Sequence, residues 1–436
     1  MAQSQTSRHP DLSHGHGLVA FPHRVAPWIE PWFFAYACLG VVQGGLLPML
    51  LPLSASDPTR AGTIVGAMNL AGLSAPFWGH FADRRGLHRP VLLAGLAAVL
   101  VALLLMPVPL SLPVKTAVAV LLGMGFAAAN TVATMFIVEV RPQEEWDARI
   151  GAFQAMTGLG QVAGLLTAGV IGGRYALAFS FAAVLVAAAV PIAWWTLRAV
   201  HIPTSRNAVV AHAPIGGEGW AGAPHRMHHL PTWRGLKTVL RNLEMPFARH
   251  LLVWFGAFSA ISAVNTLFPL ALLRGFGVGH GVPATTYAFA AALSLGLYPV
   301  AAALAKRRGP RLLLRAGLTA RTVAIALLAL AFLEGARLLP LALAAFVLLV
   351  LAWPLLAVSG TALAAQLAPG EKGEALGLFN ASAALAGAVG AVLGGAVMQA
   401  FGYGRLCMGA AVVVAVAAML SRGAATSSAN ARAAVA

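Results

Sequence analysis

The sequence predicts an all-α polytopic membrane protein, built as two pseudo-symmetric bundles of six transmembrane helices each. Three observations support this fold class. The 436 residues are 59% hydrophobic and only 10% charged, whereas a soluble protein carries about a quarter charged residues. The apolar runs reach the length of about 20 residues that a membrane-spanning helix needs. One long polar interval separates these runs into two sets of six.

The twelve expected helices are the apolar runs bounded by charged residues, proline or glycine. The first six cover 30–52, 60–82, 90–108, 114–139, 148–172 and 177–198, and the second six cover 249–273, 283–305, 312–333, 338–366, 375–400 and 404–421. The interval between them is rich in His, Pro, Arg and Gly, which is typical of a linker. The predicted organisation is an N-terminal tail (1–29), a six-helix bundle (30–198), a linker (199–248), a second six-helix bundle (249–421) and a C-terminal tail (422–436).

The distribution of cations predicts the orientation of the chain. If both chain ends lie on one side of the membrane, the connectors on that side hold 22 Lys and Arg residues and the opposite connectors hold 6. Cytoplasmic loops carry the excess of cations. We therefore expect a multi-pass protein of the cytoplasmic (inner) membrane with both termini in the cytoplasm.

The composition and the residue spacing also exclude several functions. The net charge of +16 is spread over the connectors, unlike the concentrated basic face of a nucleic-acid-binding domain. We find no nucleophile–base pair, phosphate-binding loop or metal-ligand cluster in the sequence, so we expect no enzyme activity, no cofactor and no metal site. The expected partners are a small-molecule substrate and membrane lipids, without nucleic acid, and we expect a monomer. The tryptophans near span ends, such as Trp32, Trp194 and Trp195, are interpreted as an interfacial belt.

The two halves repeat each other in sequence. The first helix ends "QGGLLPML" and the seventh contains "NTLFPLAL", which pairs Pro48 with Pro269 and Gln43 with Asn265. The fifth helix opens "RIGAFQ" and the eleventh "ALGLFN". This second match pairs Gly151 with Gly377, Phe153 with Phe379, Gln154 with Asn380 and, further along, Gly164 with Gly390. Duplicated six-helix units are typical of secondary transporters, whose substrate site lies between the repeats near the bilayer midplane.

The stretch "GHFADRRGLHRP" (79–90) carries most of the charge between the second and third helices. It resembles the loop motif of the major facilitator superfamily, which has the form G-x-x-x-D-[RK]-x-G-x-[RK]-[RK]. The matching residues are Gly79, Asp83, Arg84, Gly86 and Arg89, and His88 stands where a cation is usual. The resemblance implies a latch that holds the cytoplasmic side shut, in which Asp83 meets the start of helix 11 and a motif arginine pairs with Glu139. The alternative is a solvated loop that only sets topology.

A second resemblance lies in the fifth helix, whose small residues follow the antiporter-type motif G-x8-G-x3-G-P-x2-G-G. Gly151, Gly160, Gly164 and Gly169 match it, whereas Leu165 and Ala168 depart from it. In the second half, Gly377, Gly390 and Gly394 repeat the spacing. The motif implies export. The alternative is general small-residue packing between helices.

Polar residues within spans are the candidates for a substrate cavity, because each costs free energy unless it faces protein or water. In this family helices 1, 4, 7 and 10 line the cavity. The candidates are Gln43, Asn130, Thr134, Gln154, Asn265, Arg321, Trp353 and Asn380, and Trp254 could add a further aromatic wall. Each amide could equally serve as an interhelical hydrogen bond. For Arg321 the alternatives are snorkelling, structural pairing or contact with the substrate.

The functional hypothesis is a secondary active transporter of the major facilitator type that exports a small hydrophobic or amphipathic compound by alternating access. Two alternatives remain open at this stage: a facilitator or uptake carrier of a neutral metabolite, and a transporter-like receptor without turnover. The membrane interior of the predicted helices holds no Asp or Glu, so the sequence indicates no coupling ion.

Overall fold

The computed structural model describes residues 30–55, 57–140, 146–197, 246–335, 338–368 and 372–421. These residues form helices joined by short turns, without a strand. Eleven of the described helical segments are long and apolar enough to cross a membrane, and the segment from Pro58 to Arg85 forms a twelfth rod. The predicted fold class is therefore confirmed. Both tails and residues 199–245 of the linker lie outside the described residues.

The N-terminal bundle consists of spans 1 to 6. Span 1 is α1 (Phe33–Gly40), the π-helix η1 (Val41–Leu46) and α2 (Leu47–Ser54), and span 2 is α3 (Pro58–Ala71), the 3-10 turn η2 (Gly72–Ser74) and α4 (Ala75–Arg85). Spans 3 to 6 are α5 (His88–Leu105), α6 (Leu112–Val140), α7 (Trp146–Ile171) and α8 (Tyr175–Thr196).

The C-terminal bundle consists of spans 7 to 12. Spans 7 to 9 are α10 (Pro246–Phe276), α11 (Gly281–Arg308) and α12 (Pro310–Glu334). Span 10 is α13 (Leu339–Leu351) followed by α14 (Trp353–Gln366), and spans 11 and 12 are α15 (Lys372–Phe401) and α16 (Tyr403–Leu420). Span 7 starts at Pro246 and not at 249, because a proline is well tolerated in the first turn of a helix.

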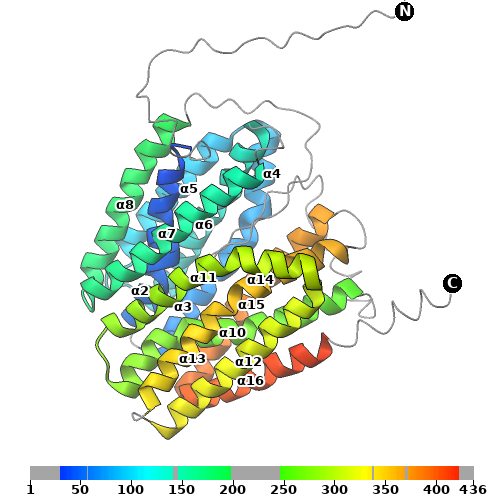
Figure 1. Ribbon diagram of the computed structural model, residues 1–436. Helices are drawn as coiled ribbons and strands as arrows, with labels where there is room; N and C mark the ends of the chain where they lie inside the picture. Colours follow the sequence, from blue (N-terminus) through cyan, green and yellow to red (C-terminus); the bar gives the residue numbers. More distant parts are fainter. Residues whose placement is uncertain are drawn as a thin grey trace, which may run out of the picture.

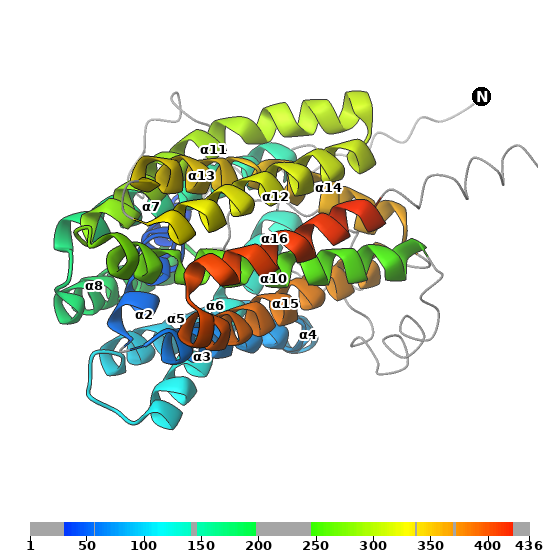
Figure 2. The same ribbon diagram turned by 90° about the horizontal axis from the view of Figure 1, so that it is seen from below.

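Twelve crossings place the start of span 1 and the end of span 12 on the same face, which we call the terminal face; the opposite one is the far face. The two bundles come together on the side of α2 and α3 and diverge toward α4 and α14 (Figures 1 and 2). Glycines mark the contact. A methyl group on Gly62 of α3 would overlap the carbonyl oxygen of Ala391 in α15, and one on Gly395 would overlap that of Pro58. Since α3 starts and α15 ends at the far face, the bundles are closed there.

Span 1 contains an irregularity that span 7 lacks. Residues Val41–Leu46 form a π-helix, whereas α10 runs unbroken through the corresponding region. The sequences explain the difference: Trp32, Tyr36 and Gln43 precede Trp254, Phe258 and Asn265 by 222 positions, but Pro48 precedes Pro269 by 221. Span 1 thus holds one extra residue within the π-helix, where the wider i→i+5 turn accommodates it.

Candidate functional site

The glycines of span 5 hold it against span 1. Methyl groups on Gly160 and Gly164 would overlap the carbonyl oxygens of Ala37 and Val41 in span 1. From the other side, a methyl on Gly45 would lie 2.5 Å from the Cα atom of Gly164. The two backbones are therefore in direct contact, which only glycine permits.

The other glycines of the span 5 motif have different surroundings. Gly169 faces α11 of the opposite bundle, where a methyl group would lie 3.4 Å from the Cγ2 atom of Thr285. Gly158, which the motif does not include, also faces α11, where an added methyl group would meet the side chain of Leu295. Gly151 has no atom within 4 Å of an added methyl, so it has no packing role among the described residues.

Span 11 repeats this packing one helical turn out of register. A methyl on Gly390 would overlap the carbonyl oxygen of Ser259 in span 7, and one on Gly394 would lie 2.6 Å from the Cβ atom of Ala263. Gly377 is buried near the start of α15. The sequence match pairs Gly390 with Gly164, but by its contact Gly390 corresponds to Gly160.

The loop motif lies at the terminal-face end of spans 2 and 3. Gly86 ends α4 in the left-handed conformation, with φ 64°, and an added methyl on Gly79 would lie 3.2 Å from Thr131 of α6. Arg84 is exposed. The guanidinium of Arg89 donates a 2.9 Å hydrogen bond to the carbonyl oxygen of Trp194 and lies 3.9 Å above its ring. This contact fixes the loop to span 6, within the same bundle.

The predicted latch itself is not tested by these contacts. The side chains of Asp83 and Glu139 lie outside the described residues, although both positions belong to helices, α4 and α6. Whether Asp83 meets span 11 and whether an arginine pairs with Glu139 therefore stay predictions.

Two of the candidate amides meet in the N-terminal bundle. The Nδ2 atom of Asn130 in α6 donates a 3.0 Å hydrogen bond to the Oε1 atom of Gln43, which lies within the π-helix. Seven residues before Gln43, about two turns, the hydroxyl of Tyr36 donates to the carbonyl oxygen of Ala129 at 2.7 Å. Spans 1 and 4 are thus joined by two side-chain hydrogen bonds, and both amides are half-buried.

The remaining polar candidates belong to several different helices. Asn265 of α10 and Asn380 of α15 are each half-buried. Gln154 is also half-buried, and its Nε2 atom has no hydrogen-bond acceptor within the described parts of the chain. Thr134 lies in α6, but its side chain is outside the described residues.

The C-terminal bundle contains a cluster of four aromatic side chains. The ring of Trp254 lies 4.6 Å from Phe379, 5.9 Å from Phe258 and 6.4 Å from Trp353. Trp254 is 5% exposed. The indole nitrogens of Trp254 and Trp353 are both buried and have no hydrogen-bond acceptor in the described structure. We call these four residues, Trp254, Phe258, Trp353 and Phe379, the aromatic cluster. It joins spans 7, 10 and 11.

Arg321, in α12, packs against Trp353 of the aromatic cluster. Its side chain is 0% exposed, and the guanidinium carbon lies 5.2 Å from the centroid of the Trp353 ring. A cation over an indole face is attracted by the ring quadrupole. The arginine therefore packs inside the bundle against a candidate residue and does not snorkel to the membrane surface.

Sequence reasoning missed two contacts at the terminal-face ends of spans 1 and 7. Arg149 of α7 forms a short ion pair with Glu30, with side-chain exposures of 9% and 14%. In the other bundle, the Nε2 atom of His250 donates to the carbonyl oxygen of Gly360 at 3.0 Å, and its ring stacks 5.7 Å from Phe379. Only the unusual position of a charge or histidine at a span end could have indicated either contact.

The interpretation of Trp32 as part of an interfacial belt is wrong. Trp32 is 4% exposed and packs 5.6 Å from Phe153 and 5.5 Å from Tyr36. Trp32 occupies the position that Trp254 has in the other bundle. Its ring packs on Phe153 as the ring of Trp254 packs on Phe379, and this contact buries it. Trp194 and Trp195, at 50% and 64% exposed, remain free to face the membrane interface.

Comparison with known proteins identifies the class. Solved structures with the same fold include the nucleoside transporter NupG, with a TM-score of 0.68 and 13% identity over 90% of this chain and 96% of that one. The D-xylose-proton symporter gives 0.63 and 15% over 90% and 95%. The human organic anion transporter MFSD10 gives 0.57 and 18% over 92% and 100%. At these identities the likeness shows the fold alone.

The family follows from the sequence itself. The model of the Major Facilitator Superfamily matches residues 32–355, so the chain belongs to this superfamily. A search of curated protein sequences gives no match. The family confirms the predicted transporter and the expectation that the chain is not an enzyme. It also confirms a multi-pass membrane protein.

Proposed function

We propose that the chain is a secondary active transporter that exports a small hydrophobic or amphipathic compound by alternating access. The family supplies the transporter class. The closure of the two bundles at the far face supports one end state of a rocking cycle, since a carrier must close one face while the other admits substrate. We place the terminal face in the cytoplasm of the inner membrane, as the cation distribution predicts.

The observation that carries the substrate class is the aromatic cluster. Two buried indole N–H groups, on Trp254 and Trp353, have no acceptor among the residues that the structure describes, and a donor buried without a partner costs free energy. A ligand that brings an oxygen acceptor would satisfy them, while its apolar part packs on Phe258 and the indole rings. We therefore propose a mainly apolar substrate that carries at least one carbonyl or ether oxygen.

The resemblance of span 5 to the antiporter-type motif supports export over uptake, whereas the close packing of its central glycines fits both that motif and general small-residue packing. Gly160 and Gly164 rest directly on span 1, which carries Gln43. An uptake carrier of a neutral metabolite and a receptor without turnover are the competing outcomes that the following two experiments separate.

The first experiment measures binding to purified protein. The probe is Nile red, a neutral aromatic compound with carbonyl and ether-type oxygens, and the readout is its dissociation constant in nanodiscs. Trp254→Phe and Trp353→Phe keep an aromatic ring and remove the donor, so each should weaken binding about three- to tenfold. Trp195→Phe, at a residue that is 64% exposed, is the matched control and should leave the affinity unchanged. Equal affinities for all four proteins would contradict the proposed site.

The second experiment measures direction. The same probe is added outside right-side-out and inside-out vesicles, and its uptake into them is followed with and without a proton gradient. Export predicts accumulation in inside-out vesicles that contain the protein and none in vesicles with Gly164→Leu. Accumulation in right-side-out vesicles would indicate uptake, and saturable binding without accumulation in either would indicate a receptor.

A further inference from the structure

A second site lies outside the aromatic cluster, at the far-face end of the N-terminal bundle. A cavity of about 130 Å³ opens there between α2, α3, the connector after α5 and the start of α6. Leu51, Ile64 and Met106 form its apolar wall, and each of the three is at most 5% exposed. Arg60 and Lys115 complete the lining.

The electrostatics of this cavity favour an anion. The far-face connectors hold only 6 of the 29 Lys and Arg residues. Two of those six, Arg60 and Lys115, line this cavity. Two helices also begin at the cavity, α3 at Pro58 and α6 at Leu112, and the N-terminus of a helix carries a partial positive charge.

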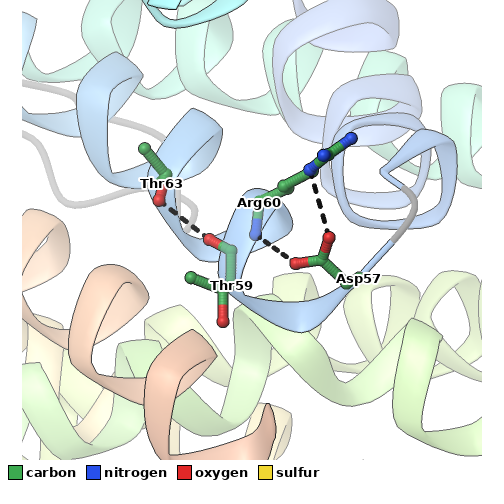
Figure 3. Close-up of polar contacts among 4 residues, drawn as sticks. All are labelled: Asp57, Thr59, Arg60 and Thr63. Atoms are coloured by element: carbon green, nitrogen blue, oxygen red, sulfur yellow. Dashed lines mark hydrogen bonds and ion pairs between the residues drawn. The ribbon is translucent and has the colours of Figure 1, made fainter. Parts of the chain in front are cut away.

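One acid partly offsets these charges, and its position is informative. Asp57 caps α3 by accepting a 2.8 Å hydrogen bond from the backbone N–H of Arg60, and it pairs with the Nε atom of the same residue at 3.2 Å. Figure 3 shows the terminal nitrogens of Arg60 pointing away from Asp57. The hydroxyl of Thr63 is turned to the carbonyl oxygen of Thr59 at 2.8 Å. Asp57 thus orients the guanidinium without using its outer edge, and Lys115 adds a second positive charge to the lining.

We propose that this cavity binds the phosphate group of an anionic amphiphile, with the phosphate oxygens on Arg60 and Lys115 and the first apolar segment on Leu51 and Ile64. The volume supports this assignment. A complete drug-sized ligand needs about 300–1,000 Å³, so a cavity of about 130 Å³ admits a headgroup while the remaining chain lies outside in the bilayer.

The site belongs to one rigid body. All of its lining residues fall between Leu51 and Lys115, within spans 1 to 4. Phosphate binding is therefore expected to be the same whether the far face is closed or open, so it does not depend on the transport proposal.

The test compares the two sources of a phosphate group. Lipid binding is measured by native mass spectrometry after exchange between phosphatidylcholine and phosphatidylglycerol, and inorganic phosphate binding by the thermal midpoint in detergent. The variant is Arg60→Gln with Lys115→Gln, and Lys115→Gln alone serves if the pair folds poorly. The matched control is Arg174→Gln with Arg405→Gln, two exposed far-face cations that change the net charge equally.

Wild-type protein and the control should prefer phosphatidylglycerol, and the double variant should lose that preference by about tenfold or more, because each cation near a lipid phosphate contributes about 1 kcal/mol. Stabilisation of the wild type by inorganic phosphate alone, lost in the double variant, would support the site and identify a free anion as its ligand. The same lipid and phosphate response in the wild type, the double variant and the control would overturn the proposal.

Discussion

The two bundles share a backbone plan but use different chemistry to hold their first span. In the N-terminal bundle, the ion pair between Glu30 and Arg149 and the amide pair between Gln43 and Asn130 join span 1 to spans 5 and 4. In the C-terminal bundle the positions of the ion pair hold Leu252 and Ala375.

Hydrogen bonds to backbone carbonyl oxygens, from His250 to Gly360 and from Tyr403 to Val264, and aromatic stacking hold span 7 there. Span 7 is held by Trp254, Phe258 and their stacking on Trp353 and Phe379. The comparison teaches that glycine contacts and the Trp–Phe pair carry the shared architecture. The polar groups have diverged, so each bundle offers a different surface to a ligand.

The largest expected effect comes from the shared part, the glycine contacts. Gly164→Leu and Gly390→Leu each force a side chain onto a carbonyl oxygen of the facing span, and both should lower the free energy of unfolding in bicelles by about 3 kcal/mol or more. Gly151→Leu belongs to the same motif but meets no atom within 4 Å, so it should behave as wild type. Equal stability of all three variants would mean that the spacing reflects only the Gly-rich composition and that these glycines form no packing motif.

The next effect tests a feature that only the N-terminal bundle has. Glu30→Leu removes one carboxylate from Arg149, which is 8% exposed, and should cost about 1.5–3 kcal/mol of unfolding free energy, as for a hydrogen bond between charged groups. Adding Arg149→Ala recreates the residues of the C-terminal bundle and should recover most of that loss. A double-mutant cycle checks this directly, and a double variant no more stable than Glu30→Leu alone would refute the comparison.

The smallest effect concerns one hydroxyl that separates the repeats. Tyr36 corresponds to Phe258, so Tyr36→Phe removes the 2.7 Å hydrogen bond to Ala129 and should cost about 0.5–1.5 kcal/mol. Tyr403→Phe, which removes a 2.9 Å hydrogen bond to Val264 in the other bundle, is the matched case. A loss above 3 kcal/mol for Tyr36→Phe alone would mean that the hydroxyl supports more than this one bond.

The sequence predicted the features that recur along one helix. Twelve apolar runs, the repeated prolines and glycines and the loop around Gly86 all follow from local spacing, and the structure describes spans close to the predicted ones. The π-helix was encoded as a one-residue difference between Gln43–Pro48 and Asn265–Pro269, but a single helix shows no anomaly there. The extra residue appears when the two repeats are aligned, and only the folded chain shows that it forms a π-helix.

The site was harder to predict because spacing on one helix does not identify the helix that faces it. The partners Glu30 and Arg149 are 119 residues apart, and the aromatic cluster gathers three different spans. Arg321 was recognised as anomalous, but its burial against Trp353 could not be read from its own span. Sequence thus located candidate residues without saying which of them meet.

The central claim is that two rigid bundles rock about a contact that is closed at the far face. The most direct measurement uses spin labels in lipid nanodiscs, on a protein whose two free cysteines are replaced by serine. One pair, at Thr59 and Gln399, spans the far face, and the other, at Arg85 and Gln366, spans the terminal face; all four residues are exposed.

Gly62→Leu places a side chain against Ala391 and should open the far face. We predict that the distance between the far-face labels then increases while the distance between the terminal-face labels decreases in the same sample. A longer far-face distance with an unchanged terminal-face distance would contradict the account, because the bundles would then deform locally instead of rocking.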